Sequence, residues 1–122
     1  MATINKEISH VQGIAPKDTF TINDDQDVAI DIIADGWSAE IKVRRGFNPS
    51  APVIATFSTA NTKLEFNTSI TGQVDFNFDG TEFDSETIKG YKKAFRYDFE
   101  MTDGAGITYT ITSGDWILIS NI

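Results

Sequence analysis

The sequence predicts an all-β protein whose antiparallel strands form a single β-sandwich. The clearest sign is the segment 95–101, in which apolar and charged residues alternate without interruption. Successive side chains of a strand point to opposite faces, so this alternation directs one row of side chains into a core, namely Phe95, Tyr97, Phe99 and Met101. Segments of similar character recur at short intervals and are separated by turn-forming residues, which is typical of sandwiches and barrels.

Four strands are expected in the first half of the chain, at residues 6–11, 19–22, 28–33 and 37–44. Turn-forming residues at 23–27 and at Asp35–Gly36 bound the third of these strands. Alternation within that strand places Val28, Ile30 and Ile32 on one face, and Ala29, Asp31 and Ile33 on the other. Residues 1–15 form either an N-terminal arm or the first strand, and residues 16–122 form the sandwich domain.

Six strands are expected in the second half, at residues 53–57, 64–66, 72–78, 95–101, 107–112 and 116–119. The alternation stops between residues 79 and 90. In that stretch Asp84 or Ser85 is suited to cap a single helical turn through Lys89, and Gly90 is suited to end it. We therefore expect one short helical turn near residues 85–89.

The last expected strand differs from the others because its four residues, 116–119, are all apolar. Both of its faces must therefore be covered. Either the strand is central in its sheet, or one face packs against another subunit, because an exposed apolar strand favours aggregation.

The composition is that of an ordinary soluble globular protein of one domain, with 122 residues, 40% hydrophobic residues and no cysteine. The formal net charge of −8 opposes binding to nucleic acid and to anionic membranes. The polar N-terminus lacks the basic start and apolar centre of a signal peptide. No apolar run approaches the roughly 20 residues that span a bilayer.

The residues that usually carry chemistry are sparse. His10, the only histidine, falls in the expected arm and has no partner nearby in the sequence. Asn23, Asp25 and Asp27 present oxygen atoms at alternating positions, but the glycine and distal glutamate of a calcium loop are missing, which favours a solvated turn. We therefore predict no catalytic, cofactor-binding or metal-binding residues, and a protein that is not an enzyme.

With no catalytic, cofactor-binding or metal-binding residues predicted, we expect the protein to act through contacts with partner proteins. Arg44 and Arg45 beside Phe47 form the one basic and aromatic cluster, and such residues are favoured at interface hot spots. The alternative is an edge strand that runs into a loop. The residues predicted to contact a partner are Trp37, Arg44, Arg45, Phe47, Trp116, Ile117 and Ile119.

The last third of the chain resembles a signature of small bacteriophage tail and baseplate proteins. In that signature a Tyr-Asp-[Leu/Phe]-Glu strand, here 97–100, precedes an Asp-x-x-Gly turn, here 103–106. A further strand and a Gly-x-[Trp/Phe/Val]-x-Val ending follow, to which 114–118 correspond. Residues 41–45 and 71–78 fit the order of the family's earlier strands more loosely. These proteins are similar to the N-terminal domain of phage baseplate upper proteins.

The resemblance implies an immunoglobulin-like β-sandwich that serves as a non-enzymatic virion structural protein of the tail, neck or baseplate. Its partners would be other virion proteins, with multiple copies arranged in a ring or lattice, and it would be made in the host cytoplasm. Two alternatives stay open: a capsid decoration protein of the same fold, and a carbohydrate-binding β-sandwich module.

Overall fold

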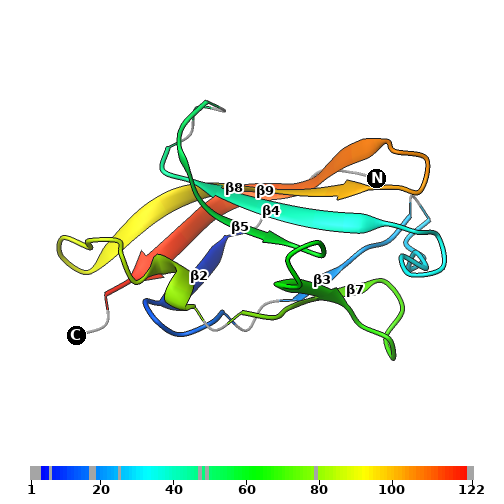
Figure 1. Ribbon diagram of the computed structural model, residues 1–122, viewed down its shortest axis with the longest axis horizontal. Helices are drawn as coiled ribbons and strands as arrows, with labels where there is room; N and C mark the ends of the chain where they lie inside the picture. Colours follow the sequence, from blue (N-terminus) through cyan, green and yellow to red (C-terminus); the bar gives the residue numbers. More distant parts are fainter. Residues whose placement is uncertain are drawn as a thin grey trace.

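Two β-sheets face each other across a shared hydrophobic core in the computed structural model of the chain (Figure 1). The structure describes residues 4–5, 7–16, 19–24, 26–46, 48, 50–78 and 80–120. The expectation of an all-β protein is confirmed.

Among the described residues the larger sheet has six strands and the smaller sheet has three. The larger contains β1 (Ile4–Asn5), β2 (Ile8–Val11), β4 (Ser38–Arg44), β5 (Val53–Ser58), β8 (Lys92–Thr102) and β9 (Thr108–Ile119). Their order is β1-β9-β8-β4-β5, and β2 also lies beside β9. The smaller contains β3 (Thr19–Thr21), β6 (Leu64–Phe66) and β7 (Gln73–Phe76), in the order β3-β7-β6.

The larger sheet is mixed rather than antiparallel. Strands β1 and β2 run parallel to β9, with Ile8 opposite Trp116 and Val11 opposite Ile119. The prediction of a purely antiparallel sandwich is therefore wrong, because the N-terminal segment adds to the sheet beside the last strand and in the same direction. Of the two expectations for residues 1–15, a first strand is the one that the described residues show.

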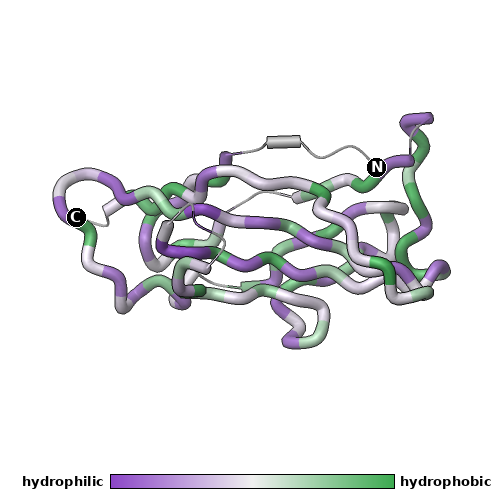
Figure 2. The backbone as a smooth tube through the Cα atoms, turned by 90° about the horizontal axis from the view of Figure 1, so that it is seen from above, coloured by the Kyte–Doolittle hydropathy of each residue, from purple (hydrophilic) through white to green (hydrophobic). Residues whose placement is uncertain are grey.

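Strand β8 has the predicted register. Phe95, Tyr97, Phe99 and Met101 are all buried, with at most 1% of each side chain exposed. Phe99 lies opposite Ile41 of β4, and both side chains face the core. Hydrophilic and hydrophobic positions alternate along the long strands, as the colouring of Figure 2 shows.

Strand β9 is continuous, whereas the sequence suggested two strands separated at residues 113–115. Those residues stay in the ladder because β8 is long enough to pair with them, Gly114 opposite Tyr97 and Asp115 opposite Arg96. The register between β8 and β9 shifts by one residue at a single irregularity. There Phe99 pairs with Thr112, the next residue of β8 pairs with Thr110, and Ile111 of β9 has no partner in β8.

The apolar end of β9, residues 116–119, is central in its sheet. This was one of the two alternatives that the sequence left open, the other being a face covered by another subunit. These residues lie between β8 and β2. Trp116 and Leu118 expose none of their surface, and Ile117 on the opposite face exposes 8%.

Residues 28–33 do not form the predicted strand. Only Ala29 pairs, in an isolated bridge with Asn23. The chain then turns at Asp31. Its side-chain carboxylate accepts a hydrogen bond from the backbone N–H of Ala34, and its backbone carbonyl accepts one from the N–H of Asp35. Ile32 remains in the core, but Val28 is exposed to solvent.

The single helical turn lies at Thr81–Phe83, earlier than the predicted 85–89. It follows Gly80, whose φ of 91° is in the left-handed region that favours glycine. The turn buries Phe83 completely. A core aromatic residue therefore fixes its position, and the capping candidates Asp84 and Ser85 do not.

Trp116 is the centre of an aromatic cluster that joins the two sheets. The ring centroids of Phe57, Phe83 and Tyr97 lie 5.5–5.7 Å from that of Trp116. The indole Nε1–H of Trp116 also donates a hydrogen bond of 2.8 Å to Nε2 of His10. His10 is 6% exposed and lies in β2, so the expectation that it sits in an arm is wrong, and its partner is far away in the sequence.

Candidate functional site

The predicted contact residues do not form one surface. Trp37 lies directly before β4, half-buried against the ring of Tyr109 at 5.7 Å. Arg44 ends the same strand, and Arg45 follows it. Trp37 and the two arginines are thus at opposite ends of β4, and Phe47 lies outside the described residues.

The three predicted contact residues of β9 belong mainly to the interior. Trp116 has no exposed surface and cannot touch a partner in this fold. Ile117 is buried as well, and Ile119 is half-buried at the end of the strand. The prediction of Trp116 as a contact residue is therefore wrong, because β2 and the smaller sheet cover the strand that carries it.

Three loops meet at the end of the molecule where β4 begins and β8 ends, and we call residues 23–37, 67–72 and 103–107 the loop end. A β-carbon on Gly72 would lie 3.2 Å from the β-carbon of Ala29 and 3.3 Å from the carbonyl oxygen of Ile30, so the first and second loops touch. A β-carbon on Gly104 would lie 3.0 Å from the carbonyl oxygen of Asp35, so the first and third loops also touch.

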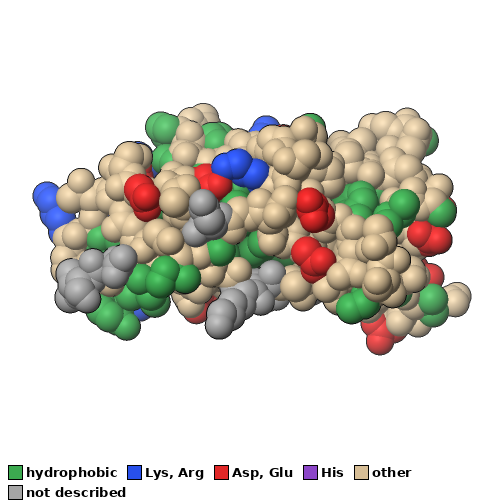
Figure 3. All heavy atoms as spheres, turned by 60° about the horizontal axis from the view of Figure 1, so that its bottom comes forward, with side chains coloured by type: hydrophobic (Ala, Val, Ile, Leu, Met, Phe, Trp, Pro, Cys, Tyr) green, Lys and Arg blue, Asp and Glu red, His purple; other side chains and the backbone are tan. Residues whose placement is uncertain are grey.

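The loop end exposes a group of large apolar side chains. Each is between 51% and 57% exposed: Val28, Ile33, Ile70 and Ile107. Figure 3 shows hydrophobic and acidic side chains together at the right of the view, the end at which Figure 1 places these loops. Apolar side chains that gather on a surface and are rimmed by polar residues mark sites of interaction with other molecules.

The charged residues of the loop end are all acidic. Its three segments contain no lysine or arginine, and the described carboxylates are those of Asp24, Asp27, Asp31, Asp35 and Asp103. Some of them also shape the loops: one oxygen of Asp103 accepts hydrogen bonds from the backbone N–H groups of Ala105 and Ile107, at 3.0 and 2.9 Å. The same turn that Asp103 holds leaves Ile107 exposed.

The oxygen-rich segment 23–27 is a turn. Asp24 accepts backbone hydrogen bonds from Gln26 and Val28, and Asp27 accepts one from the side chain of Asn23. Asp25 lies outside the described residues. Across the part of the chain that the structure describes, no group of three or more histidine or acidic side chains is placed to hold a metal ion.

The opposite end of the larger sheet is basic, and we call residues 44–45 and 86–93 the basic end. The guanidinium of Arg45 pairs with Glu86 at 3.0 Å, and Lys93 lies 3.7 Å from the other oxygen of the same carboxylate. Arg44 donates to the carbonyl of Ala51 at 3.1 Å. A hollow of about 400 Å³ opens here, lined by Thr87, Lys89, Lys92 and Lys93.

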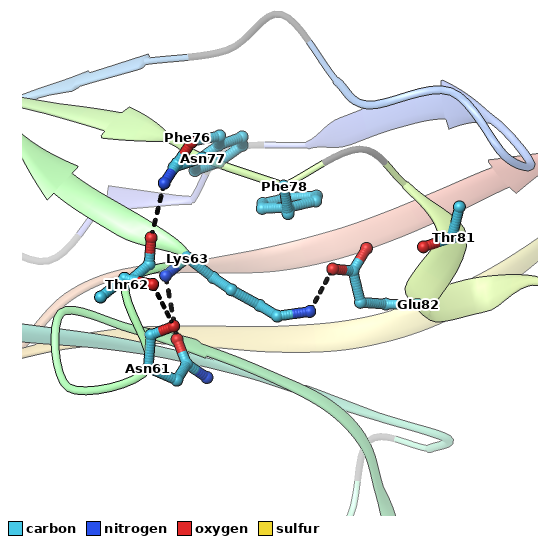
Figure 4. Close-up of a pocket in the computed structure, with 8 residues that line it drawn as sticks. All are labelled: Asn61, Thr62, Lys63, Phe76, Asn77, Phe78, Thr81 and Glu82. Atoms are coloured by element: carbon cyan, nitrogen blue, oxygen red, sulfur yellow. Dashed lines mark hydrogen bonds and ion pairs between the residues drawn. The ribbon is translucent and has the colours of Figure 1, made fainter.

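An open groove of about 610 Å³ runs between the loop before β6, the end of β7 and the helical turn (Figure 4). Phe78 forms part of its wall and stacks on Phe57 with a centroid distance of 4.0 Å and an interplanar angle of 9°. Lys63 extends across the groove to an ion pair with Glu82. The side-chain amide of Asn77 donates to the carbonyl of Thr62 at 2.8 Å.

His10 has a structural role in this arrangement. Its Nδ1 lies 2.7 Å from the carbonyl oxygen of Ile14, which can only accept, so Nδ1 carries the proton and Nε2 accepts from Trp116. Both ring nitrogens are therefore engaged inside the protein. The sequence missed this pairing because 106 residues separate the partners.

Comparison with known proteins adds no relative. None of the models of known protein families matches the chain, and no curated protein matches it in sequence. Among the described residues there is no helix of the length and apolar character needed to cross a membrane. The bacteriophage resemblance of residues 95–118 therefore stays a prediction from the sequence.

Proposed function

We propose that this chain is a non-enzymatic structural protein that works through protein–protein contacts. The observation that carries the proposal is the loop end, where four large apolar side chains are each more than half exposed within an acidic rim. A group of exposed apolar side chains with a polar rim is typical of interaction sites, because covering it with a partner removes apolar surface from water.

The setting that we propose is the virion of a bacteriophage, in the tail, neck or baseplate. The support for it is the resemblance of residues 95–118 to small phage tail and baseplate proteins. Two facing sheets around one core also support a β-sandwich, whereas the parallel pairing of β1 and β2 with β9 differs from the antiparallel sheets of an immunoglobulin fold. A capsid decoration protein of the same fold would use the same surfaces.

Mass spectrometry of purified virions tests this setting. The particles to be analysed are those of the phage or prophage whose genome carries the gene. We expect the chain to remain with the particles through density-gradient purification and at a copy number that is a multiple of the particle's symmetry. Its absence from intact virions, together with its presence in the infected cell, overturns the proposal.

A carbohydrate-binding function is the second candidate, and the groove of Figure 4 is the observation that favours it. An aromatic wall beside polar side chains suits a sugar, which has an apolar face and many hydroxyl groups. We would expect binding on a glycan array that Lys63→Gln abolishes. Lys42→Gln is the matched control, because it removes an ion-paired lysine from the other sheet.

A further inference from the structure

The charges of this protein are separated along its long axis. The loop end lies where β4 begins, after Trp37, and where β8 ends, before Asp103. The basic end lies where β4 ends, before Arg45, and where β8 begins, after Tyr91. Strand β8 alone has 11 residues, which corresponds to a separation of roughly 35 Å. One end therefore presents acidic groups and the other presents basic groups on opposite sides of the same molecule.

The basic end has cations that the fold itself does not use. Glu86 is held between Arg45 and Lys93, with its side chain only 10% exposed. Lys89 and Lys92 are exposed, and no acidic side chain among the described residues pairs with either of them. Tyr91, 68% exposed, lies between them in sequence and offers an aromatic contact surface.

The loop end has the complementary set. Asp35 and Asp31 project from one exposed turn next to the exposed Ile33. Among the described residues no lysine or arginine forms an ion pair with either carboxylate. Each end thus combines unpaired charge of one sign with exposed apolar or aromatic surface.

We propose that the loop end of one copy docks on the basic end of a second copy, so that copies of this chain associate head to tail. This inference rests on the proposed structural function and names the partner. The two surfaces differ from each other, so the contact is heterologous, and each added copy leaves one surface of each kind free. Such a contact builds rings or filaments, and it does not stop at a dimer.

The apolar side chains decide whether the contact is stable. Exposed ion pairs contribute little by themselves, and salt screens them. The charges orient the approach and exclude the like-charged ends from pairing, while burial of Ile33, Ile107 and Tyr91 supplies the favourable free energy. Association should therefore weaken with added salt.

Two charge-reversed variants test the proposal. The first, Lys89→Glu with Lys92→Glu, takes the formal charge of the basic end from +4 to 0 and leaves the loop end unchanged. The second, Asp31→Lys with Asp35→Lys, takes the formal charge of the loop end from −6 to −2 and leaves the basic end unchanged. By sedimentation velocity at low salt, we expect the unmodified chain to associate with rising concentration and each variant to associate at least about tenfold more weakly. An equimolar mixture of the two variants should associate again.

The matched control exchanges an ion pair in the middle of β4. Glu40→Lys with Lys42→Glu leaves the net charge and both ends unchanged, and its association should equal that of the unmodified chain. Far-UV circular dichroism of each variant checks that it is folded.

Carbodiimide cross-linking identifies the contact directly, because it joins a carboxylate to an amine only where the two touch. We expect cross-linked peptides that join Asp31 or Asp35 to Lys89 or Lys92. The ends lie too far apart for such a link within one copy, so it reports on two copies.

The proposal is overturned if the unmodified chain stays monomeric at its highest soluble concentration in low salt. It is overturned equally if both variants associate as the unmodified chain does, or if their mixture does not associate. A chain that is present in virions but does not associate with itself refutes the second copy as the partner and leaves the structural function standing. A chain that associates as described but is absent from virions supports the head-to-tail contact and refutes the proposed setting.

Discussion

Phe99 and Glu100 are neighbours in sequence whose side chains point to opposite faces of β8. Phe99 is completely buried against Phe20 of the smaller sheet, with a centroid distance of 4.6 Å. Phe99→Ala should therefore lower the free energy of unfolding by about 3–5 kcal/mol, through lost burial and the cavity that remains. Glu100→Ala should change it by about half a kcal/mol or less. Urea denaturation measures both, and equal effects would contradict the register of the strand.

The hydrogen bond between His10 and Trp116 gives a second prediction at the scale of single residues. His10→Phe keeps an aromatic ring against Phe83 but removes the acceptor for the buried indole N–H. A buried donor without a partner costs about 1–3 kcal/mol, so the free energy of unfolding of the variant should be lower by that amount. Urea denaturation measures this loss as a lower midpoint concentration. Ser9→Ala, at an exposed neighbour, is the control and should stay near the unmodified value. A His10→Phe variant as stable as the unmodified chain would show that the hydrogen bond contributes nothing.

Two glycines with similar backbone angles differ in their surroundings. Gly80 and Gly90 have φ values of 91° and 83°, and a side chain at either position adopts a strained conformation. A β-carbon at Gly80 would also lie 2.6 Å from the carbonyl carbon of Ile14, whereas nothing lies within 4 Å at Gly90. Gly80→Ala should therefore destabilise the fold by about 1–3 kcal/mol more than Gly90→Ala does. Equal losses in thermal denaturation would mean that the two segments do not pack as described.

At the scale of elements, β9 is paired on both sides, by β8 on one side and by β1 and β2 on the other. Strand β5 pairs only with β4 and forms an edge of the larger sheet. Hydrogen exchange should therefore be slowest in β8 and β9 and faster in β5, because edge amides open without disturbing the core. Exchange at residues 116–119 as fast as in β5 would show that β2 does not stay docked.

The whole molecule should unfold as one unit because both sheets contribute to the same core. Val74 of the smaller sheet and Ile41 of the larger are both completely buried in one cluster. We expect Val74→Ala and Ile41→Ala to shift the same single transition, with coincident midpoints for tryptophan fluorescence and far-UV circular dichroism. The spectrum of the native protein should be dominated by β-structure. Separate transitions for the two variants would mean that the sheets fold independently.

The strands with strict alternation could be predicted from the sequence because their side-chain pattern depends only on local geometry. This holds for β8, whose buried row matches the expected one, and for β4 and β6, which lie within the expected ranges 37–44 and 64–66. Segment 28–33 has the same pattern and forms no such strand, since strand formation needs a partner with free backbone groups, and Asp31 turns the chain first. The exposure of Val28 and Ile33 therefore could not be predicted, and the loop end was missed for that reason. A signal was present in Asp31 itself, because aspartate side chains accept hydrogen bonds from nearby backbone groups and hold turns.

By itself, the sequence determined the all-β class, the inward row of β8 and the need to cover both faces of residues 116–119. Each of these follows from the order of apolar and polar residues along a single strand. The tertiary structure alone decided that β2 pairs beside β9, that His10 accepts from Trp116, and that Trp37 packs against Tyr109. These facts depend on which distant segments pair with one another. That choice is made by the packing of the whole core, which no local pattern contains.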